Sequence, residues 1–135
     1  MVDPRQLSDF SESLGRCMAD RRFLDRFYEL FIGSSPEVAE RFRDTDFVRQ
    51  KRALSSSLYV MVMAMEGGEA ACAYLEQIAR RHAKDELDIR PEFYDVWLDC
   101  LIAAAREHDP LFSESTEQAW RAVMRFGIEF MQSRY

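Results

Sequence analysis

Residues 75–82 read LEQIARRH and end on one of only two histidines in the chain. His82 follows Ile78 by four residues and Leu75 by seven, so the three side chains share one face of a predicted helix. A neutral imidazole on an apolar helix face is either a hydrogen-bonded core residue or a metal ligand. Spacing alone favours the core residue, and both interpretations stay open at this point.

The flanking sequence repeats the same three-and-four spacing of apolar residues along the whole chain. Asp3-Pro4 and Ser35-Pro36 each join a helix-capping side chain to a proline suited to the first helical position. Gly33 and Gly67-Gly68 end two of the periodic stretches. No segment alternates like a strand, so we predict an all-α domain. Its seven helices are expected over residues 4–18, 23–32, 36–42, 47–65, 69–84, 91–108 and 113–130.

The composition fits one domain, and we expect residues 1–135 to form a single unit. The net charge of −6 argues against nucleic acid or anionic membranes as partners. No apolar run approaches the roughly 20 residues of a membrane span, and no signal peptide is visible. Cys17, Cys72 and Cys100 form no C-x-x-C pair and are expected to be free, small apolar residues in a reducing cytoplasm.

Aromatic and polar residues precede the histidine of LEQIARRH at defined spacings. Tyr28 stands eight residues before Pro36, and Phe42 stands six residues after it. Gln50 and Leu54 are one helical turn apart, and Leu54 precedes the histidine by 28 residues. In order and spacing, this pattern resembles bacterial globins, namely single-domain haemoglobins and the globin halves of flavohaemoglobins. The matching stretches are Phe27-Tyr28, Pro36-Glu37-Val38 through Phe42, Ala53-Leu54, Ile78-Ala79 through His82, and Ile89-x-Pro91-Glu92-x-Tyr94.

The resemblance implies a globin fold, in which three helices pack on three others around a haem b. His82 would be the proximal ligand of the iron, since a haem needs a single axial protein ligand. The Nδ1 proton of that ligand needs an acceptor, and the carbonyl of Ile78 is the expected one. Tyr28 and Gln50 would face the bound gas, whose partial negative charge a hydroxyl or amide stabilises. The residues expected to contact the haem are Phe42, Phe47, Lys51, Leu54, Ile78, Arg81, Ile89, Tyr94, Trp97 and Met124.

Most of these residues also have an interpretation without a cofactor. Tyr28 and Gln50 fit an ordinary helix interface, and Phe42, Leu54 and Trp97 fit an ordinary core. Taken one at a time, the simpler interpretation is preferable for every residue except His82. The shared order and spacing favour the haem site.

Charged residues near the predicted site leave similar alternatives. Arg81 and Lys51 suit pairing with the anionic haem propionates, and equally suit a solvated surface. His108 lies beside Asp109-Pro110 at a predicted helix end, where we expect an exposed cap.

The resemblance implies a haem protein that binds O2, NO or CO reversibly in the cytoplasm, as a monomer or a homodimer. An alternative is an NO dioxygenase that uses a separate reductase, because the 135 residues contain no G-x-G-x-x-G motif and no flavin domain. A gas-sensing module without its own output domain is another alternative. A globin that has lost its haem is the last, and the presence of His82 and Phe42 argues against it.

Overall fold

The computed structural model describes residues 2–82 and 91–134 of the chain. These residues form seven α-helices and no β-strand, which confirms the predicted all-α class. Within the same ranges, no helix is long and apolar enough to cross a bilayer. The helices are α1 (Pro4–Met18), α2 (Arg22–Ile32), α3 (Pro36–Arg41), α4 (Phe47–Met65), α5 (Glu69–His82), α6 (Glu92–His108) and α7 (Glu114–Ser133).

Most helices begin where a side chain can accept a hydrogen bond from a first-turn amide. At the start of α3, the hydroxyl of Ser35 accepts from the amide of Val38 at 3.2 Å. The same kind of cap begins α1, α4 and α7, at Asp3, Asp46 and Ser113. Each cap satisfies an amide that has no partner inside the helix and contributes about 1 kcal/mol. After α4, Gly67 has a φ of 91°, a left-handed conformation that favours glycine and turns the chain into α5.

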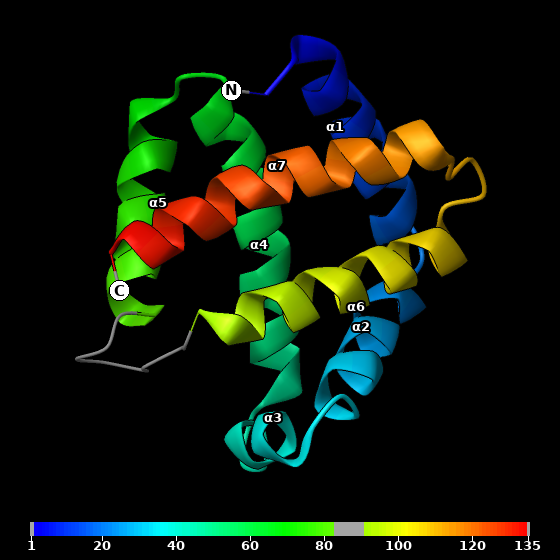
Figure 1. Ribbon diagram of the computed structural model, residues 1–135, viewed down its shortest axis with the longest axis vertical. Coiled ribbons are helices and arrows are strands. Elements are labelled where there is room, and N and C mark those ends of the chain that lie inside the picture. The colour runs from blue at the N-terminus through cyan, green and yellow to red at the C-terminus, as the bar shows by residue number, and fades with distance from the viewer. Residues whose placement is uncertain (1, 83–90, 135) are drawn as a thin grey trace.

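The helices form two layers. Close packing joins α1 to α7, α2 to α6 and α4 to α5. In Figure 1, α6 and α7 run side by side across the molecule, and α4 and α5 run across the direction of α7. Contacts of α7 with α1, α4 and α5 hold the layers together. One layer contains α1, α4 and α5, and it packs on a second layer that contains α2, α6 and α7. This is the predicted arrangement of three helices on three.

The centre of the core is aromatic. Trp120 of α7 is fully buried, and its ring meets Phe10 of α1 edge to face at a centroid distance of 4.8 Å. Phe23 of α2 packs against the same indole at 6.2 Å. Burying a side chain of this size stabilises the fold by roughly 1.5–3 kcal/mol. This cluster therefore fixes α1 and α2 against α7.

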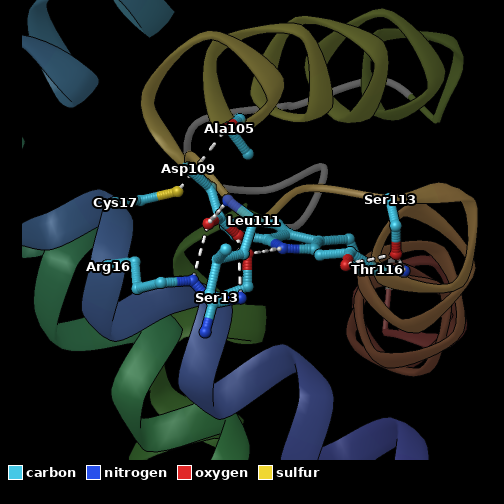
Figure 2. Close-up of polar contacts among 9 residues, drawn as sticks. Ser13, Arg16, Cys17, Ala105, Asp109, Leu111, Ser113 and Thr116 are labelled. Atoms are coloured by element: carbon cyan, nitrogen blue, oxygen red, sulfur yellow. Dashed lines mark hydrogen bonds and ion pairs between the residues drawn. The ribbon is translucent and has the colours of Figure 1, made fainter.

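A buried polar network joins α1 to the corner between α6 and α7 (Figure 2). The indole N–H of Trp120 donates to the hydroxyl of Ser13 at 2.9 Å, and that hydroxyl donates to Asp109 at 2.6 Å. Arg16 donates two hydrogen bonds to the same carboxylate, at 2.6 and 3.0 Å. Burial raises the pKa of Asp109, but the hydrogen bonds from Arg16, Ser13 and the Leu111 amide outweigh burial and hold the pKa below its ordinary value. The carboxylate is therefore ionised at neutral pH.

Two expectations from the sequence are wrong. His108 is half-buried and not an exposed cap: its Nδ1 lies 2.9 Å from the carbonyl of Ala104, and its ring packs against Phe23. The neighbouring Asp109 is buried, where Ser13 and Arg16 hydrogen-bond to it. The end of α6 therefore lies against the core and not in solvent. Cys72 is exposed and not a core residue, because it lies in the first turn of α5, before the first buried residue of that helix.

Candidate functional site

His82 is the last described residue of α5 and is half-buried. Its Nδ1 lies 2.8 Å from the carbonyl oxygen of Ile78, the hydrogen bond expected from the sequence. A carbonyl oxygen only accepts, so Nδ1 carries the proton and Nε2 keeps a free lone pair. Burial lowers the pKa of His82, the bond to Ile78 opposes this, and the charge of Arg81 lowers the pKa further. The side chain is therefore a neutral imidazole with one oriented nitrogen available for a ligand bond.

Tyr28 of α2 lies in a cluster of aromatic rings. It is only 5% exposed, and its ring meets Phe47 at 5.4 Å and Phe42 at 5.7 Å, both edge to face. Burial raises the pKa of Tyr28 to about 12, although a side-chain hydrogen bond with Gln50 of α4 acts in the opposite direction. The structure thus brings together four residues predicted for the haem site. The phenol stays protonated at neutral pH and can donate a hydrogen bond.

Large apolar side chains from three helices are incompletely buried. Leu54 of α4, Ile78 of α5, and Tyr94 and Trp97 of α6 all pack against the core without being part of its buried interior. Trp97 reaches the ring of Phe27 at 6.1 Å. Side chains of this kind gain stability when an apolar group covers them. These four apolar side chains are therefore suited to contact the flat faces and the edge of a porphyrin.

The remaining predicted residues lie in different surroundings. Met124 of α7 is 1% exposed, inside the core. Lys51 forms an ion pair with Asp25 of α2 at 2.5 Å, and Arg81 is exposed. Ile89 lies outside the described residues. Pairing of Lys51 or Arg81 with a propionate stays a prediction.

The donor set also fits a haem better than a bare metal ion. In the described part of the chain, no three His, Cys, Asp or Glu side chains converge as a metal site would require. His82 presents a ring nitrogen that the bond from Nδ1 to Ile78 orients. One nitrogen ligand is what a haem takes from a protein when its other axial position stays open.

Sequence reasoning missed the residues of α2 that flank Tyr28. Asp25, Glu29 and Ile32 line a groove together with Tyr28, Phe47 and Lys51. Positions 25, 28, 29 and 32 follow the three-and-four spacing of one helix face, which was the available signal. The face is half acidic and half apolar, so the apolar periodicity alone did not reveal it.

Comparison with known proteins agrees with this geometry. The family model described as Globin matches residues 26–129. A solved structure of the Pseudomonas aeruginosa PAO1 protein PA3967, described as structurally highly homologous to a human hemoglobin, superposes with a TM-score of 0.91. It is 38% identical, and the match covers 96% of this chain and 98% of that one.

Two curated relatives are flavohemoproteins. The one from Halalkalibacterium halodurans is 32% identical over 98 residues, which are 70% of this chain and 23% of that protein. The one from Rhizobium meliloti is 30% identical over 86 residues, which are 62% of this chain and 21% of that protein. The chain therefore matches less than a quarter of each flavohemoprotein.

The family match covers well over half of the chain, and the fold agrees with it. The chain belongs to the globin family. Membership of this family implies haem binding and, through the haem, binding of a small gas.

Proposed function

We propose that the chain binds a diatomic gas reversibly, O2 and also NO or CO, at a haem b whose iron has His82 as its protein ligand. The observation that carries the proposal is the 2.8 Å hydrogen bond from Nδ1 of His82 to Ile78, which leaves Nε2 free on the helix that the globin resemblance assigns to the iron ligand. When bound, haem would supply an iron able to coordinate a diatomic gas. Two helices carry residues that could donate a hydrogen bond to that gas, Tyr28 on α2 and Gln50 on α4.

The chain's own residues have separable roles in this proposal. Tyr28 donates a hydrogen bond to the gas, and Gln50 orients the Tyr28 hydroxyl or donates a second hydrogen bond. Phe42 and Leu54 exclude water from the same side. The proposed haem contacts are Phe42, Phe47, Lys51, Leu54, Ile78, Arg81, Ile89, Tyr94, Trp97 and Met124.

The direct test is haem reconstitution of the purified chain, followed by absorption spectroscopy. We expect one haem per chain and a CO spectrum that reverses when CO is removed. A chain that takes up no stoichiometric haem would contradict the proposal.

A second candidate function is oxidation of NO to nitrate with O2, using electrons from a separate reductase. The observation in its favour is the similarity to flavohemoproteins. The name of those proteins indicates a flavin, which can supply electrons, beside a haem. The same Tyr28 hydroxyl serves both functions, because each needs a hydrogen-bond donor beside the gas. Turnover with and without a reductase distinguishes them, as set out in the Discussion.

A further inference from the structure

A surface groove of about 450 Å³ runs between α2 and α4 on the outer side of Tyr28. Asp25, Tyr28, Glu29 and Ile32 form its α2 wall, and Phe47 and Lys51 form its α4 wall. Tyr28 is otherwise almost completely buried, so the groove is where solvent comes closest to it. The groove thus ends at the side chain that we propose faces the gas.

The floor of the groove is made of aromatic rings. Tyr28 and Phe47 meet there edge to face, with 5.4 Å between their centroids. Phe47 is half-buried, and its ring stacks on Phe42 at 6.1 Å. Phe42 and Phe47 are both among the proposed haem contacts, so the rings that line the groove continue into the proposed haem site.

The mouth of the groove is crossed by an ion pair. The ammonium of Lys51 lies 2.5 Å from a carboxylate oxygen of Asp25, and the two side chains are 32% and 53% exposed. Exposed ion pairs contribute little stability and exchange readily with water. The pair can therefore open without disturbing the helices on either side.

We propose that this groove is the entry and exit path of the diatomic ligand, with the Lys51–Asp25 pair partly obstructing its mouth. The inference rests on the proposed function, because it assigns a route to the same gas site. A residue on a path changes the barrier to entry and to exit equally. The association and dissociation rate constants then change by the same factor, and the equilibrium constant does not change.

Ile32→Trp tests the path by filling the groove with a larger side chain, with CO as the probe. The association rate constant comes from flash photolysis of the CO complex of the haem-loaded protein, and the dissociation rate constant from displacement by NO. We expect both to fall about five-fold, because narrowing a path raises one barrier in both directions. Met63→Trp is the matched control: Met63 lines another groove, with Ser11, Leu14, Tyr59 and Val62, and both constants should keep their values.

Asp25→Asn provides a second test that adds no bulk. It removes the ion pair at the mouth, and both rate constants should rise by about two-fold or more. Unchanged constants in both variants, or a change in dissociation alone, would overturn the path while leaving the gas site intact. If the unaltered haem-loaded protein failed to bind CO, the proposed function itself would be wrong.

Discussion

At the scale of single residues, burial determines the state of the side chain that we place beside the gas. Burial raises the pKa of Tyr28 to about 12, so the phenol keeps its proton across the physiological range. A protonated phenol is a donor, which suits a ligand that carries partial negative charge.

Tyr28→Phe removes the hydroxyl and leaves the ring in place. A hydrogen bond to a charged group is worth about 1.5–3 kcal/mol, so we predict O2 dissociation roughly ten-fold faster or more. Stopped-flow displacement of O2 measures this rate. Tyr59→Phe is the matched control, since Tyr59 is 40% exposed on α4, and it should not change the rate. Equal rates for Tyr28→Phe and the unaltered protein would mean that this hydroxyl does not reach the gas.

Local contacts of single residues could be predicted from sequence, and distant ones could not. The bond from His82 to Ile78 spans four residues, so helix geometry alone placed it. The partner of Lys51 is 26 residues away, and Ser13 and Asp109 are 96 residues apart. Those contacts depend on how helices cross, which apolar spacing does not specify. The half-burial of His108 was missed for the same reason.

At the scale of helices, α4 and α7 approach each other through a glycine. A Cβ added at Gly127 would overlap the terminal methyl of Met61 and lie 2.9 Å from its sulfur. We predict that Gly127→Ala destabilises the protein by up to about 1 kcal/mol in urea unfolding, because the flexible end of the Met61 side chain must move to make room. Gly15→Ala in α1 meets no atom within 4 Å, and should stabilise by up to about 1 kcal/mol. Equal effects of the two changes would contradict the close α4–α7 contact.

Helix starts were well predicted, and helix ends less so. Caps at Asp3, Ser35 and Ser113 are local signals, and α1, α3 and α7 begin directly after them. The predicted end of α7 at residue 130 is three residues short, because Met131 continues the buried face to Ser133. A fading apolar pattern marks a helix end less clearly than a capping side chain marks its start.

At the scale of the whole molecule, the Asp109 network ties the first helix to the last two. The pKa of Asp109 is lower in the folded state than in the unfolded state. The ionised carboxylate therefore stabilises the fold at any pH above the unfolded pKa, and this contribution is lost as the pH falls through the folded pKa. We predict that Asp109→Asn destabilises the protein by about 2–3 kcal/mol at pH 7. The difference from the unaltered protein should shrink below roughly pH 4, near the unfolded pKa of Asp. Urea unfolding across this range checks it, and a difference independent of pH would contradict the role of the charge.

The two candidate functions differ in where electrons come from. We predict that the 135-residue chain, loaded with haem and O2, consumes about one equivalent of NO and then stops when NADH is the only reductant, because the sequence contains no dinucleotide-binding motif. Stopped-flow mixing with nitrate analysis measures this. Sustained turnover on adding a flavin reductase would favour the dioxygenase, whereas a single burst in both cases favours reversible binding. Sustained turnover without any reductase would contradict both.

The central claim, that His82 holds the haem, is tested most directly by comparing His82→Ala with His108→Ala. The two histidines are matched: both are helical and half-buried, and each has Nδ1 bonded to the carbonyl four residues before it. The measurement is the absorption spectrum of each variant after reconstitution with haem, with and without added imidazole. We predict that His82→Ala loses stable haem or regains it only with imidazole, while His108→Ala keeps the spectrum of the unaltered protein. A normal spectrum for His82→Ala without imidazole would contradict the account.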